Sequence, residues 1–286
     1  MKKHKVLSLL VSAAMAYSAF PAIPVAAKGT PSQGLSPADS IKANIDKTKF
    51  THKEWAGTHY TDVDGNAQAA EDVTGINREA ASTQIIPYQD SAAAQKAVWN
   101  YNAREESQKM QMLTGENENW DLTVVQNETL ANEMMMEDHA FYKTDFKKGE
   151  GEDWKSVTLP QSWTTQGFDF SIYTNTQMPW QSKYDTNVPC PTAPTNYNPV
   201  GLYRKTFTID DSLRGSDRRI YLDFRGVESA YYVYINGKEV GYSEDTFSPH
   251  KFDITDYVNM DGENLLAVKV HKFCDGTWFE DQDMIY

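Results

Sequence analysis

The dipeptide Asn236-Gly237 stands between two apolar runs, Tyr231 to Ile235 and Lys238 to Tyr242. Both residues tolerate the positive φ angles of a type I′ turn, and Asn-Gly between apolar runs is the strongest short signal for a hairpin. The sequence therefore predicts a tight antiparallel strand pair at this position.

Other short segments show the same period of two. In Arg219 to Arg225, for example, Ile220, Leu222 and Phe224 share one face of the predicted strand. Short strands that recur with turn signals about every 8 to 12 residues are typical of a sandwich or barrel. We therefore predict an all-β fold, a β-sandwich of the jelly-roll type. The remaining predicted strands are Trp120 to Val125, Trp154 to Leu159, Leu202 to Ile209 and Leu265 to His271.

The N-terminal region reads as an export signal. A basic stretch, Met1 to Lys5, precedes the apolar stretch Val6 to Phe20, and small residues stand at Val25-Ala26-Ala27. This order is typical of a secretory signal peptide, here residues 1–27 with cleavage after about Ala27. The apolar stretch is too short for a comfortable membrane span. We therefore expect a secreted or cell-surface protein.

The rest of the chain divides by composition. Residues 28–49 are rich in Ser, Pro, Gly and Ala and are predicted to be a flexible lead-in. Residues 50–112 form an N-terminal arm in which Ser91 to Met112 has helical spacing without Pro or Gly, so a helix is expected there. Residues 113–286 are expected to form the sandwich.

The net charge limits the classes of binding partner, and the two cysteines permit a disulfide. A net charge of -13 repels nucleic acid and anionic lipid, so both are poor candidates, whereas a neutral sugar is indifferent to it. The aromatic share of 12% fits either a β-rich core or a surface on which sugar rings stack. Cys190 and Cys274 lie in a chain expected to be exported, which permits a disulfide but does not require one.

Several blocks, taken in order, resemble bacterial β-galactosidases of glycoside hydrolase family 2. They include Gly75-Ile76-Asn77-Arg78-Glu79, Val157-Thr158-Leu159-Pro160-Gln161-Ser162-Trp163, Asn198-Pro199-Val200-Gly201-Leu202-Tyr203-Arg204 and Phe224-Arg225-Gly226-Val227-Glu228, and then Cys274-Asp275-Gly276-Thr277-Trp278 before Glu280-Asp281-Gln282-Asp283-Met284. The resemblance covers about Phe50 to Tyr286. It implies a galactose-binding-domain-like sandwich, the sugar-binding part of an exported β-galactosidase that acts on terminal β-D-galactosides.

The resemblance also implies site residues. Asn198 and Asp275 match positions that contact galactose hydroxyls in the family, and Asp275 matches a ligand of a sodium ion. An amide offers both a donor and an acceptor to a hydroxyl, and a carboxylate oxygen suits a hard cation. Read from the residues alone, Asn before Pro and Asp-Gly are ordinary turn formers. Trp163, Trp180 and Trp278 are as well explained by packing as by sugar stacking.

The same resemblance implies that the chemistry lies elsewhere. A retaining glycosidase needs an acid/base and a nucleophile about 5 to 5.5 Å apart, and in this family both belong to a (β/α)₈ barrel, which also holds magnesium. Glu280, Asp281 and Asp283 match a structural turn, and His250 and His271 are expected to be ordinary core or surface histidines. No catalytic residue is therefore assigned in this chain, whose own missing barrel is its expected partner.

Relatives continue the block at Glu280 with further strand residues, so we expect a sandwich without its last strand. Such a chain is expected to be marginally stable by itself and prone to self-association, including a homo-oligomer.

Two other functions compete with the main one. The first is a free-standing exported carbohydrate-binding module without hydrolase activity. The second is another family 2 hydrolase such as a β-glucuronidase, against which the block from Glu280 to Met284 speaks.

Overall fold

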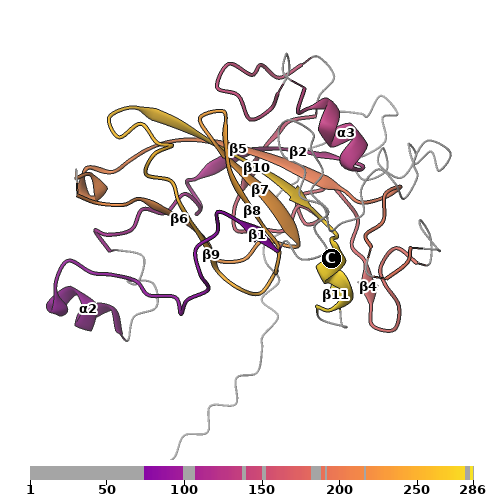
Figure 1. Cartoon of the computed structure of the whole chain (residues 1–286), viewed down its shortest axis with the longest axis horizontal. Coiled ribbons are helices and arrows are strands. Elements are labelled where there is room, and N and C mark those ends of the chain that lie inside the picture. Colours follow the sequence, from indigo (N-terminus) through magenta and orange to yellow (C-terminus); the bar gives the residue numbers. More distant parts are fainter. Residues whose placement is uncertain are drawn as a thin grey trace, which may run out of the picture. The chain divides into compact units, whose positions relative to one another are not determined.

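The computed structural model describes residues 74–98, 107–136, 140–149, 153–181, 188–190, 192–215, 217–280 and 284–285. The predicted signal peptide, the lead-in and residues 50–73 of the arm lie outside these ranges. The fold is mostly antiparallel sheet with short helices (Figure 1). The strands are β1 Gly75–Ile76, β2 Asn119–Val125, β3 Lys155–Thr158, β4 Tyr173–Thr174, β5 Val200–Thr208, β6 Tyr221–Phe224, β7 Ala230–Ile235, β8 Lys238–Ser243, β9 His250–Asp253, β10 Glu263–His271 and β11 Met284–Ile285. The helices are α2 Ser91–Val98 and α3 Glu128–Glu133, with 3-10 turns η2 Asp211–Leu213 and η3 Asp275–Trp278.

One large sheet organises the sandwich. Its seven strands lie in the order β1-β8-β7-β10-β5-β2-β3, and every neighbouring pair is antiparallel. Two smaller sheets pair β6 with β9 and β4 with β11. The all-β sandwich is thus confirmed, and each strand predicted from alternation is present within a few residues of its expected bounds. The predicted hairpin joins β7 to β8, with φ of 51° at Asn236 and 80° at Gly237.

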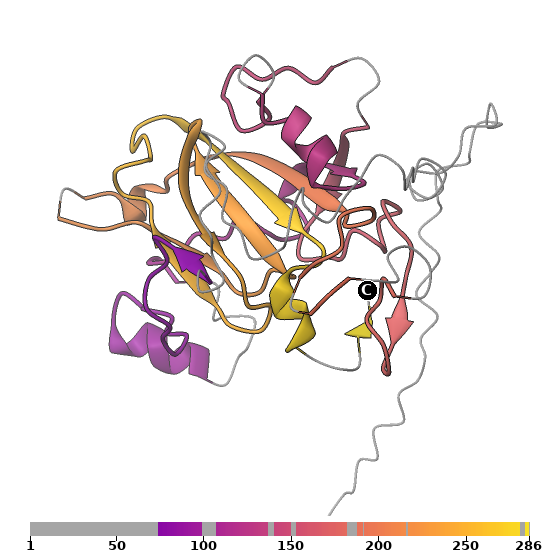
Figure 2. The ribbon, with the colours of Figure 1, turned by 45° about the vertical axis from the view of Figure 1, so that its right-hand side comes forward.

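Both faces of the large sheet are covered. On one face, alternate residues of β10 (Leu266, Val268 and Val270) pack with Leu222 of β6 and Phe252 of β9 in the main core. On the other face a second core forms, in which α3 and residues 140–142 pack over the sheet. Figures 1 and 2 show α3 and the β6–β9 pair on opposite sides of the sheet. A strand buried on both faces, such as β7, therefore has every side chain buried.

The edge of the sheet at β1 depends on a close approach. A Cβ atom added to Gly241 of β8 would collide with the carbonyl oxygen of Ile76 and the ring of Phe252. A glycine there lets β1 lie beside β8, in the register Ile76↔Tyr242. The arm is thus held to the sandwich by strand pairing, which the sequence did not predict.

The predicted helix from Ser91 to Met112 is wrong in its second part. The structure has α2 at Ser91–Val98, whereas the described residues from Ser107 onward are not helical. Ser107 donates its hydroxyl to the carbonyl of Pro87 and accepts from the amide of Lys109, which forms a turn. The Gln111 side chain then donates a hydrogen bond to the carbonyl of Thr208 and accepts one from the amide of Asp210. Tertiary contacts therefore override the helical spacing of this stretch.

The two cysteines are free, so the permitted disulfide is absent; Cys190 is exposed and Cys274 is buried. Within the described ranges, the helices are all too short or too polar to cross a membrane. The division into a 50–112 arm and a 113–286 sandwich, like the marginal stability and self-association of the chain, stays a prediction.

Candidate functional site

Asp275 lies where the chain leaves the sheet. β10 ends at His271, and the backbone turns into η3, whose first residue is Asp275. The turn is fixed because the Thr277 hydroxyl accepts a hydrogen bond of 3.1 Å from the amide of Cys274. The Trp278 indole donates to the carbonyl of Thr192 at 2.7 Å and so ties η3 to the long loop before β5. Asp275 is therefore half-buried on a rigid turn at one end of the sandwich.

Asn198 holds the segment that leads to Asp275. Its side-chain nitrogen donates to the carbonyl of Phe273 at 2.9 Å, and its side-chain oxygen accepts from the amide of Phe273 at 2.9 Å. The side chain thus extends the β5–β10 ladder beyond its last register pair, Val200↔His271. Both predicted site residues therefore lie at the segment from Phe273 to Asp275. Asn198 is 1% exposed, and both polar atoms of its side chain are hydrogen-bonded to Phe273. Sugar contact by either residue stays a prediction.

Glu244 is the partner of Asp275, and the sequence did not single it out. It follows β8 directly, is 5% exposed and accepts a hydrogen bond from the Tyr242 hydroxyl. Burial and the neighbouring charge of Asp275 raise the pKa of Glu244 to about 8, and the two carboxyl groups share a hydrogen bond. The pair therefore holds a proton at neutral pH. In the sequence, the only indication of Glu244 is that this acidic residue closely follows a predicted strand.

The surroundings of the pair are partly acidic and partly aromatic. Glu280 accepts from the amide of Thr246 at 2.9 Å and from its hydroxyl at 3.0 Å, which fixes the loop after Glu244 against η3. Phe247 on this loop is 68% exposed, and Phe279 beside η3 is 78% exposed. A buried aromatic cluster supports η3 from behind, with Trp180 and Trp278 ring centroids 5.6 Å apart. Trp180 is fully buried, so packing explains it.

A hard cation fits this arrangement. Ligand atoms of Glu244, Cys274 and Asp275 all lie within 4.8 Å of one another. The two carboxylates are oxygen ligands of the kind that sodium and calcium prefer. Burial raises the pKa of the Cys274 thiol, which keeps it neutral and makes it a poor ligand. The oxygen donors of this cluster are therefore those of Asp275 and Glu244, and sodium binding at Asp275 stays a prediction.

The same pair cannot cleave a glycoside. The acid/base and nucleophile of a retaining enzyme stand about 5 to 5.5 Å apart with the sugar between them. Glu244 and Asp275 instead bond directly to each other. The other carboxylate considered from sequence, Glu280, is bound to Thr246, while Asp281 and Asp283 lie outside the described residues. This corner of the sandwich can bind hydroxyls and a cation through oxygen ligands.

The histidines are core residues, as predicted. His271 is fully buried and bonds through Nε2 to the carboxylate of Glu128 at 2.5 Å, and His250 bonds to the Ser243 hydroxyl at 2.8 Å. Glu128 also accepts from the ammonium of Lys269 at 3.0 Å. This buried ionic cluster lies on the face that α3 covers, and it is structural.

The raised pKa of Glu244 predicts how stability varies with pH. The folded chain holds a proton on Glu244 up to about pH 8, whereas the unfolded chain releases it near the ordinary pKa of 4.5. The folded state thus binds more protons in this window, and the free energy of unfolding must fall as pH rises from 5 to 8. In Glu244→Gln we expect a flatter profile and a gain of about 1–2 kcal/mol at pH 8.

Thermal unfolding midpoints at pH 5, 6.5 and 8 measure this slope. Glu263→Gln, at the exposed start of β10, is the matched control and should keep the wild-type profile. Parallel profiles for wild type and Glu244→Gln would mean that the proton is held elsewhere.

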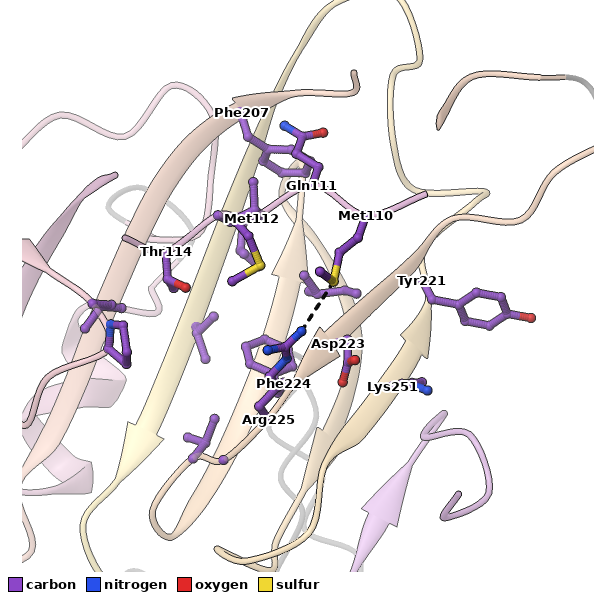
Figure 3. A pocket seen from close by; sticks show the side chains of 18 of the residues that line it. Met110, Gln111, Met112, Thr114, Phe207, Tyr221, Asp223, Phe224, Arg225 and Lys251 are labelled. Atoms are coloured by element: carbon purple, nitrogen blue, oxygen red, sulfur yellow. Dashed lines mark hydrogen bonds between the residues drawn. The ribbon is translucent and has the colours of Figure 1, made fainter. Parts of the chain in front are cut away.

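A separate cavity lies away from Asp275. It has a volume of about 1510 Å³ and lies between β6 and the large sheet, lined mainly by apolar side chains, and neither Asn198 nor Asp275 borders it (Figure 3). We place the candidate sugar site at Asp275 because hydroxyl recognition needs convergent polar groups.

The chain has clear relatives among known proteins. Residues 115–286 match the family model described as "Glycosyl hydrolases family 2, sugar binding domain". The β-galactosidase of Priestia megaterium is 40% identical over 208 residues, which is 73% of this chain and 18% of that protein. The β-galactosidase of Clostridium acetobutylicum is 44% identical over 144 residues, 50% of this chain and 15% of that protein. The chain thus spans less than a fifth of the length of these relatives.

Proposed function

Because most of its length matches the sugar binding domain, the chain belongs to family 2 of the glycosyl hydrolases, and we propose that it is the sugar-binding sandwich of an exported β-galactosidase. The observation that carries the proposal is the likeness to proteins named β-galactosidase, at 40% and 44% identity, together with the family-model match over residues 115–286, which include Asp275. In this proposal the acid/base and nucleophile come from the catalytic domain of the whole protein, as does any magnesium. The substrates are terminal β-D-galactosides.

Within that function, Asp275 accepts hydrogen bonds from galactosyl hydroxyls. Its place on a turn fixed by Thr277 and Trp278 supports this role, because recognition of a hydroxyl requires a group that does not move on binding. Asn198 has its oxygen and nitrogen engaged with Phe273, yet an amide has a second donor and a second acceptor position. A sugar hydroxyl that reaches this corner would use those positions.

Sodium fits the same corner. Asp275 and Glu244 would hold it, and when bound it would neutralise the pair and present a coordination position to a sugar hydroxyl. Two carboxylates in hydrogen-bond contact are costly to ionise together without a cation, which supports the assignment. Exported localisation, with cleavage after about Ala27, remains part of the proposal and rests on the N-terminal sequence.

The alternative is a free-standing exported module that binds carbohydrate and cleaves nothing. The exposed rings of Phe247 and Phe279 near Asp275 are the observation in its favour, because exposed aromatic rings suit sugar stacking. The likeness to complete β-galactosidases favours the main proposal over this one.

A chimera tests the two. Residues 115–286 would replace the matching segment of the Priestia megaterium β-galactosidase, and hydrolysis of nitrophenyl β-D-galactoside would be compared with nitrophenyl β-D-glucuronide. We expect galactoside hydrolysis within about tenfold of the parent and negligible glucuronide hydrolysis, because each 1.4 kcal/mol lost costs tenfold. A folded but inactive chimera, together with tight galactoside binding by the isolated chain, would favour the free module.

A further inference from the structure

A buried carboxylate, that of Asp169, joins the two segments that carry the candidate sugar-binding residues. Asp169 lies between β3 and β4, and its side chain is 0% exposed. One of its oxygens accepts hydrogen bonds from the Tyr197 hydroxyl and, at 2.7 Å, from the amide of Phe170. The other oxygen holds the Lys272 ammonium at 2.5 Å. A carboxylate can accept all of these donors, so the group is fully engaged inside the protein.

The side-chain partners of this carboxylate adjoin the two candidate site residues. Tyr197 directly precedes Asn198, and Lys272 lies three positions before Asp275. The amide of Lys272 donates to the carbonyl of Pro199 at 2.9 Å, which ties the two segments together on their backbones as well. A displacement of the carboxylate would therefore shift one segment relative to the other.

Lys272 is a poor choice for stability alone. On β10, Leu266, Val268 and Val270 face the main core, and Lys272, one position past the end of the strand, continues this row. Burial lowers the pKa of Lys272 below its ordinary value although Asp169 acts to raise it, so the ion pair does not fully offset the loss of water. Apolar residues often replace a buried ion pair without loss of stability. The geometry that the pair fixes is the better explanation for it.

We propose that Asp169 is a positioning residue, which sets the spacing between Asn198 and Asp275. It acts through Tyr197 and Lys272 and does not contact the sugar itself. A misplacement of about 1 Å can lower a rate by about 10²-fold, so the spacing of two groups that bind one sugar is important for activity. The inference rests on the proposed function, in which both groups contact the galactosyl unit.

Asp169→Asn combined with Lys272→Met separates positioning from stability. Asp169→Asn alone leaves a buried ammonium unpaired and should lower the unfolding midpoint. Adding Lys272→Met removes that ammonium, so the midpoint of the double variant should return to near that of the unmodified chain. The ionic link stays broken, and in the chimera we expect the double variant to lower kcat/KM for nitrophenyl β-D-galactoside by about 10–100-fold. A stable double variant with unchanged kcat/KM overturns the proposal.

A double-mutant cycle shows whether Asp169 acts through the sugar corner. A residue that acts through another loses much of its effect when the other is removed. In a chimera that already carries Asp275→Ala, the Asp169→Asn and Lys272→Met pair should therefore cost at least about threefold less in kcat/KM than it does in the unmodified chimera. Equal losses in the two backgrounds would mean that Asp169 does not act through Asp275, and the proposal would be wrong.

Lys205→Met is the matched control, because it removes another buried lysine from an ion pair. The Lys205 ammonium lies 2.6 Å from Glu118 and donates to the carbonyl of Asn119 at 3.2 Å. Lys205 is seven positions beyond Asn198 along β5, which at about 3.3 Å per residue places it roughly 20 Å away. We expect a lower unfolding midpoint with unchanged kcat/KM. A loss of activity equal to that of the double variant would mean that the effect is one of general stability.

Hydrogen exchange in the chain itself tests the spacing without the chimera. The amide of Phe273 donates to the side-chain oxygen of Asn198, and the amide of Asn198 donates to the carbonyl of Gln126. In the double variant we expect both amides to exchange about tenfold faster, with no change in Lys205→Met. Unchanged exchange in the double variant overturns the inference. Faster exchange together with a folded chimera that does not hydrolyse the galactoside supports the role of Asp169 in spacing and contradicts the proposed function alone.

Discussion

Glu128→Ala is expected to lower the free energy of unfolding by about 3–5 kcal/mol, because it leaves buried charge without a partner. Glu128 is 7% exposed, and its carboxylate holds the Lys269 ammonium at 3.0 Å and the His271 ring at 2.5 Å. Lys269 and His271 are 2% and 0% exposed, so water cannot replace the lost carboxylate. For a domain whose total stability is about 5–15 kcal/mol, the variant would be close to unfolding.

The pH dependence gives an independent signature of the same cluster. Burial by itself would raise the pKa of Glu128, but the charges of Lys269 and His271 and their hydrogen bonds lower it to about 2. A carboxyl whose folded pKa lies below its unfolded value contributes stability above pH 4.5 and loses it as pH falls toward 2. The wild-type chain should therefore lose this contribution between pH 4.5 and 2, and Glu128→Ala should show a shallower acid limb.

Urea unfolding at pH 7 and at pH 3 measures both effects. Glu133→Ala, on an exposed position of the same helix, is the matched control and should change stability by less than about 0.5 kcal/mol. Glu128→Gln combined with Lys269→Met should recover part of the loss, since it removes the unpaired ammonium. A loss below 1 kcal/mol in Glu128→Ala would mean that the cluster is hydrated or rearranges.

The strands were predictable because each carries its own local evidence. Period-two alternation identified β6, with Ile220, Leu222 and Phe224 facing the core, and Asn236-Gly237 identified the hairpin. β1, β4, β9 and β11 were missed because they are short: two to four residues give too little periodicity, and their pairing depends on partners far along the chain. The helix was overextended past Val98 because helical spacing says nothing about the tertiary contacts made by Gln111.

The candidate site was predictable only in part, for the same physical reason. Asn198 and Asp275 came from the likeness of their motifs to a family, and the structure brings them together through Phe273. Glu244 was missed because its importance lies in burial beside Asp275, across a gap of thirty-one positions in the sequence. Glu128 was missed for the same reason. From sequence, a Glu near the start of a short helix is explained by its favourable interaction with the helix N-terminus, and only the structure shows its ion pair with Lys269.

Asp275→Ala in the chimera is expected to lower kcat/KM for nitrophenyl β-D-galactoside by about 10²–10³-fold. A hydrogen bond to a charged group contributes about 1.5–3 kcal/mol, and the loss of a cation ligand adds to it. Asp275→Asn keeps a hydrogen-bonding side chain but not the charge, so an intermediate loss and a weaker dependence on sodium are expected. Asp261→Ala, whose side chain is 91% exposed on a distant turn, should leave kcat/KM unchanged.

Asn198→Ala distinguishes recognition from folding at the same corner. It removes both side-chain hydrogen bonds to Phe273, so we expect a lower unfolding midpoint together with lower activity. Asp275→Ala, by contrast, should lose activity while its unfolding midpoint stays the same or rises, because it relieves the contact between two carboxyl groups. If Asp275→Ala is folded and keeps kcat/KM within about threefold of the unmodified chimera, Asp275 does not contact the sugar, and the binding corner proposed here is wrong even though the family assignment stands.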